Sequence, residues 1–504
     1  MKKLISLLLC AMVVLTLVAA LASCANDSDG NDNGTTTPSP DSQTPTDTAP
    51  DSGNIGSDTT TGANEADDLG DVRFEGSTYD ILSRELTAYE VESSDISGDL
   101  VGDAVYGRNV ALEERFGIKI NVVKKPGNWD NRDDFMSTVT NSIMAGTHDY
   151  DLVMTHSAYI VNLALKGSGY DLYELDGIDF SKKWWCQKYV DNAAVFDRAY
   201  TAMGDIGYTL YEYMECVFFN KKLAEDAGVP ELYPMVKSGE WTYDKFKEYT
   251  MLVGEDLDGN GTRDSLDRYG LGINNHACRM AVTFWDAKLT VPGSDGRQVI
   301  NLPNEKYLAI YDELYSLVYD NPENVFFTHE GAKIETQMFM NDQLLFFVEK
   351  LGNAVTMKDM TSEYGIVPFP KYNLEQENYI SSARDALSAI MVMSDITEPT
   401  MVGKVTEAMC MLGYREITPV YYETALKLKY LSDPDAMEML DLIRDTMTFD
   451  FAATYTNALG LIFSTVGDNI KNNNPNITSN VKVNAKVWQK ALDQLYASFE
   501  KLDK

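Results

Sequence analysis

The chain is poor in the residues and motifs that most enzymes place at their centres. Its six cysteines form no C-x-x-C pair, and its four histidines show no metal-ligand spacing. It contains no G-x-S-x-G elbow, no H-E-x-x-H pair and no glycine-rich phosphate loop. The enzyme classes that these motifs mark are therefore not indicated, and we expect no catalytic centre and no catalytic cofactor.

Positive charge is also scarce. Lys and Arg number 42 against 77 Asp and Glu, so the formal net charge at pH 7 is −35. A polyanion of this kind repels nucleic acid and anionic lipid headgroups, and we expect no nucleic-acid partner. Solubility explains the larger part of the acidic excess.

Only the N-terminus carries a long apolar run. Lys2 and Lys3 precede an almost wholly apolar stretch from Leu4 to Ala22, the pattern of an export signal. The following Leu21-Ala22-Ser23-Cys24 resembles the lipobox of bacterial lipoproteins. That resemblance implies a signal peptide over residues 1–23 and acyl chains on Cys24, which would anchor the protein to the outer face of the cell membrane. An uncleaved signal anchor with an incidental cysteine is the alternative.

A low-complexity segment comes next. Between Ala25 and Asp71 the chain is mostly Ser, Thr, Asp, Asn, Gly and Pro, with eleven acidic residues and no Lys or Arg. Such a segment cannot bury enough apolar surface to offset the entropy of ordering, so residues 24–71 are predicted to form a disordered acidic tether behind the lipid anchor.

The remainder, from Val72 to Lys504, is too long for one ordinary core, and two domains are expected. Four widely spaced cysteines fall in this part of the chain: Cys186, Cys216, Cys278 and Cys410. Export permits disulfides, but four buried thiols fit the spacing equally well.

The folded part opens with alternating strand and helix signals. The strands are predicted at Ser77–Ser83, Ile118–Val123 and Tyr150–Thr155, and the helices at Val101–Phe116 and Arg132–Ala145. Gly117 and Gly146 follow the two helices, as left-handed caps do. This order predicts a parallel sheet covered by helices, with ligands bound near the carboxyl ends of the strands.

Further along, the signals are more scattered. Thr242 is predicted to cap a helix that begins near Tyr243. Two more strands are expected, at Leu344–Val348 and Tyr364–Phe369, and the tail from Thr400 to Lys504 is mostly helical by its period.

Several short motifs follow one another in a recognisable order. Val217-Phe218-Phe219-Asn220-Lys221-Lys222-Leu223, then Ala227-Gly228-Val229-Pro230, then Gly239-Glu240-Trp241-Thr242-Tyr243-Asp244-Lys245-Phe246 resemble the signature of family 1 extracellular solute-binding proteins. Glu113–Ile120, Tyr150–Val153 and Tyr364–Tyr372 agree with the same pattern. These proteins are the sugar-binding components of ABC importers.

The resemblance implies a two-lobed α/β clamp with a hinge of crossing strands, like the periplasmic binding proteins. Lobe 1 is expected to comprise residues 72–205 plus 345–395, and lobe 2 residues 206–344 plus 396–504. A carbohydrate would bind between the lobes of a monomer and pass to the ABC permease, and the protein would not be an enzyme.

A separate loop matches a calcium-binding pattern. The twelve residues from Asp256 to Asp267 place oxygen ligands at positions 1, 3, 5, 9 and 12, with Gly261 at the turn. The candidate ligands are Asp256, Asp258, Asn260, Thr262 (through its carbonyl), Asp264 and Asp267. Asp267 stands where an EF-hand has Glu, so a structural Ca²⁺ is expected to bind weakly or through one oxygen. A metal-free Asp/Gly turn is the alternative.

A sugar site combines flat aromatic rings with side chains that hydrogen-bond hydroxyl groups. Position within the pattern selects nine candidates: His156, Ser157, Tyr159, Tyr211, Glu212, Trp285, Glu349, Arg384 and Asp385. Each is also compatible with an ordinary core or surface role.

Three other functions stay open. The same fold could bind a peptide or an amino acid, for which an Arg-Asp pair is also suited. A secreted glycoside hydrolase would place paired carboxylates in an aromatic cleft, but among 77 acidic residues such a pair is not informative. A cell-wall scaffold lipoprotein would suit the tether, but it predicts all-β repeats that the strand–helix opening does not contain.

Overall fold

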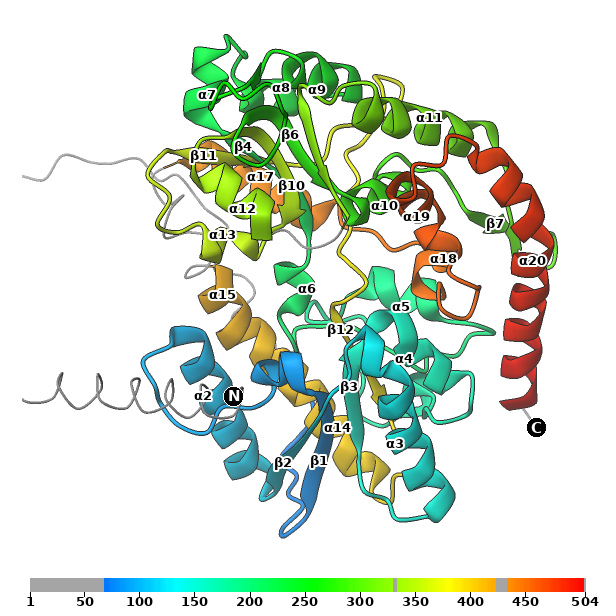
Figure 1. Cartoon of the computed structure of the whole chain (residues 1–504). Helices are drawn as coiled ribbons and strands as arrows, with labels where there is room; N and C mark the ends of the chain where they lie inside the picture. Colours follow the sequence, from blue (N-terminus) through cyan, green and yellow to red (C-terminus); the bar gives the residue numbers. More distant parts are fainter. Residues whose placement is uncertain (1–67, 330–332, 423–432, 503–504) are drawn as a thin grey trace, which may run out of the picture. The chain divides into compact units, whose positions relative to one another are not determined.

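The computed structural model describes residues 68–329, 333–422 and 433–502 (Figure 1). The predicted signal peptide, Cys24 and nearly all of the tether lie outside the described residues. Folded structure begins earlier than expected, because Leu69 is buried in a hydrophobic core and its carbonyl accepts a hydrogen bond from Lys404. The predicted end of the tether at Asp71 is corrected accordingly. Within the described residues, no helix combines the length and the apolar character needed to cross a membrane.

The first sheet has the strand order β12-β3-β1-β2 and defines the first lobe. β1 (Thr78–Arg84) pairs in parallel with both β2 (Lys119–Lys125) and β3 (Leu152–His156), and β12 (Ser388–Val392) is antiparallel to β3. The helices α2 (Leu100–Phe116) and α3 (Arg132–Ala145) connect the parallel strands. The predicted parallel sheet with helical connections is confirmed.

Both predicted helix caps are present. Gly117 and Gly146 follow α2 and α3 with φ of 70° and 62°, and their amides donate to carbonyls of the last helical turn. Glycine adopts this left-handed conformation without a steric penalty. By contrast, Thr242 precedes α9 (Tyr243–Thr250) without a side-chain capping hydrogen bond.

The second sheet has the order β11-β4-β10-β6-β5, with β9 also paired to β6. Its strands are β4 (Glu215–Asn220), β5 (Gly254–Glu255), β6 (Arg268–Asn274), β9 (Val325–Thr328), β10 (Leu344–Lys350) and β11 (Tyr364–Val367). Phe219 lies opposite Phe346 and also opposite Gly365, so β4 joins β10 and β11 to this sheet. The predicted placement of 345–395 in the first lobe is therefore wrong for β10 and β11; only β12 returns.

Two crossing segments connect the lobes. The outgoing segment includes α6 (Thr209–Glu212) and runs into β4, and the returning segment runs from Ser381 to β12. They touch at the bridge between Met214 and Ala383. The buried carboxylate of Glu90 accepts hydrogen bonds from the amide of Thr209 and the hydroxyl of Ser388, so one side chain holds both segments against the first lobe.

The sequence predicts that the chain after β12 belongs to the second lobe, but part of it packs on the first lobe. α14 (Pro399–Leu412) packs against α2 of the first lobe, and Glu407 on α14 accepts hydrogen bonds from Trp184 and Trp185. A π-helical turn, η4 (Gly413–Ile417), continues into α15 (Thr418–Tyr421). The prediction that 396–504 belongs to lobe 2 is corrected for α14.

The C-terminal elements confirm the helical tail. They are α17 (Pro434–Asp445), α18 (Phe451–Thr454), η6 (Ile462–Ser464), α19 (Thr465–Lys471) and α20 (Ile477–Leu502). α18 packs on α4 (Ser157–Ala164) and α5 (Gln187–Ala193) of the first lobe, whereas α19 packs on α10 (Asn275–Phe284) of the second. The C-terminal segment thus contacts both lobes.

The remaining elements cover the two sheets and the loops between them. They are η1 (Glu85–Glu90), η2 (Trp129–Asn131), η3 (Leu172–Glu174), α7 (Lys221–Asp226), α8 (Leu232–Lys237), β7 (Thr290–Pro292), β8 (Gln298–Ile300), α11 (Glu305–Tyr319), α12 (Lys333–Met340) and α13 (Asn353–Thr356). Cys186, Cys216, Cys278 and Cys410 are free thiols, as in the second of the two alternatives left open by their spacing, except that Cys186 is only half-buried.

Candidate functional site

A polar cluster lies where the carboxyl ends of β3, β6 and β10 meet the returning crossing segment. We call it the interlobe cluster, and it comprises His156, Ser157, Glu215, Asn274, Arg279, Glu349, Arg384 and Asp385. Five of these eight residues are among the nine predicted ligand residues. Strand ends of both sheets contribute side chains, as expected for ligand sites in α/β sheets.

Arg384 organises one half of the cluster. Its Nε donates to Glu215 Oε1 at 2.5 Å, and its Nη2 lies 2.7 Å from Glu349 Oε2. Both carboxylates are almost completely buried. Burial alone would lower the pKa of Arg384, but the two carboxylates outweigh it and raise that pKa above its ordinary value. Arg384, on the returning crossing segment, is therefore a fixed cation held by carboxylates of the neighbouring strands β4 and β10.

Arg279 and Asp385 form the other half. Arg279 Nη2 donates to Asp385 Oδ1 at 3.2 Å, and the Asp385 carbonyl accepts a hydrogen bond from Ser157 Oγ at 2.7 Å. Burial would raise the pKa of Asp385, but the positive charge of Arg279 outweighs it and holds that pKa below its ordinary value. One hinge residue therefore contacts α10 of the second lobe and α4 of the first.

His156 is neutral at physiological pH. Burial lowers the pKa of its imidazole to about 4, although the charge of Asp385 opposes the shift. Its Nδ1 accepts a hydrogen bond from the amide of Ala158 at 3.3 Å, which leaves the proton on Nε2. The ring also stacks on Tyr159 with 5.5 Å between centroids.

Three polar atoms of the cluster are buried and have no hydrogen-bond partner among the described residues. They are Glu215 Oε2, which can accept a hydrogen bond, and Arg279 Nε and Arg384 Nη2, which can each donate one, although Arg384 Nη2 is ion-paired with Glu349. Together with the paired charges they offer both acceptors and donors in one small volume. Such a mixture suits a ligand rich in hydroxyl groups, since each hydroxyl can donate and accept.

The other predicted ligand residues do not belong to the cluster, although Tyr159 packs against it through His156. Trp285 is fully buried, and its Nε1 donates to the carbonyl of Pro370, so it is a core residue of the second lobe rather than an exposed ring. Tyr159 is fully buried, and its hydroxyl donates to the carbonyl of Gly127. Tyr211 and Glu212 lie in α6 on the outgoing crossing segment, where Tyr211 donates to the buried Asp205 and Glu212 pairs with Lys350.

Glu215, Asn274 and Arg279 were missed by the sequence analysis. Asn274 ends β6 and Arg279 lies on the helix that follows, so the rule that located His156 at the end of β3 would have found them had β6 been predicted. The strand was missed because Gly270 and Gly272 weaken its pattern. A Cβ at Gly270 would collide with the carbonyl oxygen of Thr250, so close backbone packing explains this glycine.

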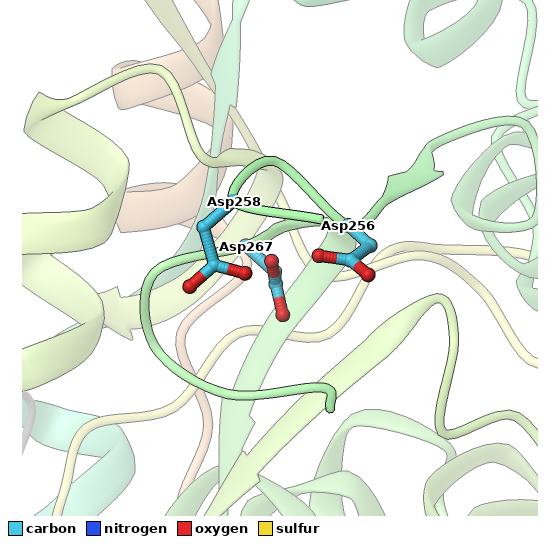
Figure 2. Close-up of side chains that lie close together, drawn as sticks. All are labelled: Asp256, Asp258 and Asp267. Atoms are coloured by element: carbon cyan, nitrogen blue, oxygen red, sulfur yellow. The ribbon is translucent and has the colours of Figure 1, made fainter. Parts of the chain in front are cut away.

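The Asp256–Asp267 loop brings together three of its predicted ligands. Figure 2 shows the carboxylates of Asp256, Asp258 and Asp267 converging from the two ends of the loop. Their oxygens can all lie within 4.8 Å of one another. Gly261 has φ of 77°, and its amide donates to Asp256 Oδ2 at 2.8 Å. This backbone hydrogen bond lowers the pKa of Asp256.

The side chains of Asn260 and Asp264, two other predicted ligands, accept hydrogen bonds from the backbone amides of the loop. Asn260 Oδ1 accepts from the amide of Thr262, and Asp264 Oδ1 accepts from the amide of Leu266. Asp267 is buried and accepts from the amides of Leu257 and Asp264. The oxygen-rich donor set suits a hard cation such as Ca²⁺.

Comparison with known proteins gave matches of structure only. No protein-family model and no curated protein sequence matches the chain. UgpB of Mycobacterium tuberculosis, solved with glycerophosphocholine, is similar with a TM-score of 0.55 and 14% identity, over 83% of this chain and 99% of that one. The galacto-N-biose/lacto-N-biose I-binding protein of Bifidobacterium longum gives 0.53 and 14%, over 85% and 98%.

A third similar structure is the ABC substrate-binding protein Lmo0181 of Listeria monocytogenes in complex with cycloalternan. Its TM-score is 0.52 and its identity 13%, over 83% of this chain and all of that one. Two of the three are described as binding proteins, and the match covers 98% or more of each of the three chains. The described chain therefore has the α/β fold of the two-lobed solute-binding proteins of ABC transporters.

Proposed function

We propose that this chain is an extracellular solute-binding lipoprotein that captures a carbohydrate between its lobes and delivers it to an ABC permease. The observation that carries the proposal is the interlobe cluster: strand ends of both sheets and the hinge supply donors and acceptors to one place, in a fold whose solved relatives include carbohydrate complexes.

The crossing segments give this capture a mechanism. A solute that contacts side chains of both lobes stabilises the closed arrangement over the open one, because only the closed arrangement makes both sets of contacts. Asp385 already joins Arg279 of the second lobe to Ser157 of the first. A bound hydroxyl that hydrogen-bonds to Asp385 and Arg279 would contact the hinge and the second lobe together, and would therefore favour the closed form. The closed form would be the one that binds the permease.

The N-terminus places this activity at the cell surface. The signal over residues 1–23 directs export, Cys24 carries the acyl anchor, and the acidic tether holds the folded part away from the membrane. The chain acts as a monomer without enzymatic activity and without nucleic acid. The strongly negative charge keeps it soluble and unattached to anionic surfaces.

Carbohydrate is favoured over other solutes because His156 is neutral and each guanidinium of the cluster is already paired with a carboxylate, which leaves neither free to bind the carboxylate of a zwitterion. A second candidate keeps the same fold but takes another small solute. It is favoured by UgpB, whose solved ligand is glycerophosphocholine. A peptide or amino acid ligand belongs to this alternative.

The Asp256–Asp267 loop adds a structural role for calcium in the proposal. Asp256, Asp258 and Asp267 would provide carboxylate oxygens to the ion, and Gly261 permits the turn that brings them together. The bound cation would neutralise part of the repulsion between the carboxylates and brace the loop that precedes β6. It would take no part in solute binding or in any reaction.

A thermal-shift screen of the chain from residue 25 to 504 tests the function. The ligands are mono- and oligosaccharides, amino acids and short peptides. A ligand at 100 times its dissociation constant stabilises the folded state by about 2.7 kcal/mol, which is a readable shift in melting temperature. Shifts confined to sugars support the proposal, shifts confined to peptides or amino acids support the alternative solute, and no shift with any ligand contradicts both.

A further inference from the structure

A second candidate site lies away from the interlobe cluster. It is a cavity of about 740 Å³ lined by three parts of the chain: the segment from Tyr173 to Asp197 in the first lobe, the β7–β8 turn at Asp295–Gln298, and the C-terminal helices at Phe451 and Tyr496. Its volume falls within the range of about 300–1,000 Å³ that is typical of small-molecule sites.

Four aromatic residues contribute to the cavity wall: Tyr173, Phe196, Phe451 and Tyr496. Tyr173 and Phe196 are unusually exposed for aromatic residues, at 48% and 37%. Phe196 contacts Tyr496 with 5.7 Å between ring centroids, and Tyr496 stacks on Phe451 with an interplanar angle of 12°. Exposed rings backed by buried ones present fixed apolar faces, which a sugar ring can cover with its C–H groups.

The backbone beneath Phe196 is strained. Phe196 and Asp197 have φ of 53° and 57°, although neither is glycine. Hydrogen bonds in both directions between Val195 and Arg198 close this tight turn. The left-handed region is unfavourable for non-glycine residues, which adopt it in tight two-residue turns and also at ligand sites. The turn holds the Phe196 ring out beside Tyr496 instead of in the core.

Polar side chains complete the lining. Asp191, Asp197 and Asp295 contribute carboxylates, and Gln298 contributes an amide. Arg297 is already engaged: its guanidinium lies 5.2 Å from the Phe196 centroid and 5.4 Å from that of Tyr496, and it pairs with Glu500 at 2.6 Å. The carboxylates accept hydrogen bonds from hydroxyls and repel anions, which favours an uncharged polyol.

We propose that this cavity is a second carbohydrate site, which holds a neutral oligosaccharide against Tyr173 and Phe196. The inference rests on the proposed function, because it assigns a further place to the same class of ligand. Residues 173–197 belong to the first lobe and the β7–β8 hairpin follows α10 of the second. An oligosaccharide in the cavity would therefore contact both lobes.

Titration calorimetry tests the proposal, using maltotetraose, cellotetraose and mannotetraose with the chain from residue 25 to 504. The variants are Phe196→Gly, which removes the ring and suits the left-handed backbone, and Tyr173→Ala. Val483→Ala, at an exposed position of α20, is the matched control. Arg279→Ala removes a side chain of the interlobe cluster.

The expected result is two sites per wild-type chain for at least one tetrasaccharide. Phe196→Gly and Tyr173→Ala should each weaken one of these sites roughly tenfold or more, as the loss of a central aromatic contact does. Val483→Ala should leave both sites unchanged, and Arg279→Ala should weaken only the other site.

Two results would overturn the inference. If a tetrasaccharide binds and neither aromatic variant changes its affinity or stoichiometry, the cavity is not a site, while the proposed function stands. If no tetrasaccharide binds the wild-type chain, both proposals fail for neutral oligosaccharides. A single site lost in Phe196→Gly and kept in Arg279→Ala would support the cavity and contradict the interlobe cluster.

Discussion

Arg279 and Asp385 are 106 residues apart in sequence, and their side chains meet at 3.2 Å between Nη2 and Oδ1. Arg279 lies on α10 of the second lobe and Asp385 on the returning crossing segment. The Asp385 carbonyl also accepts a hydrogen bond from Ser157 of the first lobe. A movement of one lobe relative to the other would therefore change the contacts of this pair. A ligand that hydrogen-bonds to the pair would therefore act on the hinge as well as on the site.

Arg279→Ala is expected to weaken carbohydrate binding by about 10- to 100-fold, since a hydrogen bond to a charged group contributes about 1.5–3 kcal/mol. The dissociation constant is measured by calorimetry. Arg279→Lys keeps the charge but not the forked geometry and should fall between wild type and Arg279→Ala. An unchanged dissociation constant in Arg279→Ala would exclude the interlobe cluster as the site.

Arg384→Met is expected to destabilise the fold by about 3–5 kcal/mol, because it leaves the buried carboxylates of Glu215 and Glu349 without their counter-charge. Urea unfolding followed by circular dichroism gives the difference in free energy. The control is Lys222→Met, which breaks the exposed pair with Asp226 and should change stability by less than about 1 kcal/mol. Equal effects of the two substitutions would contradict the structural role of Arg384.

Stability should fall as the pH rises from about 4.5 to 7. Burial raises the pKa of Glu407 from 4.5 to about 7, against the hydrogen bonds from Trp185 and Trp184. Because the folded pKa lies above the unfolded one, the folded state binds more protons in this window. The stability contributed by the protonated form is complete below the unfolded pKa and is lost as the pH approaches the folded pKa.

Glu407→Gln mimics the protonated form and should reduce this pH dependence, by an amount on the order of 1–3 kcal/mol between pH 4.5 and 8. The free energy of unfolding of both proteins is compared at several pH values. Burial also raises the pKa of Asp205 to about 7, so a residual slope is expected in the variant. If the free energy of unfolding of Glu407→Gln depends on pH as steeply as that of wild type, Glu407 is not the source of the pH dependence.

Millimolar CaCl₂ is expected to raise the melting temperature, and EGTA should reverse the rise, because the ion binds only the folded loop. Asp256→Asn should abolish most of the effect. Asp312→Asn, on an exposed face of α11, removes the same charge outside the loop and should leave the effect intact. A calcium response that persists in Asp256→Asn would place the ion elsewhere.

The N-terminal part of the fold, up to β3, could be predicted from local signals. Period and glycine caps gave the strands and helices up to β3, including the exact bounds of α3. Membership of the lobes could not be obtained in this way. It depends on pairs such as Phe219 with Phe346, which lie opposite each other in β4 and β10 although they are remote in sequence. Local periodicity contains no information about such pairing.

The candidate site was predicted in part for a similar reason. His156 ends β3, a strand that the sequence showed clearly, whereas Asn274 ends β6, whose two glycines hide the strand pattern. Trp285 illustrates the opposite error. Large aromatic residues suit both cores and sugar sites, and only the structure shows that Trp285 donates to Pro370 inside the second lobe.

The most direct test of the central claim is equilibrium dialysis of the chain from residue 25 to 504 against the oligosaccharide that gives the largest thermal shift, with mass spectrometry of the sugar recovered from the protein. Saturable binding and recovery of the sugar with its mass and length unchanged are predicted. Absence of saturable binding would contradict solute capture, and recovery of shorter sugars would show a glycoside hydrolase instead.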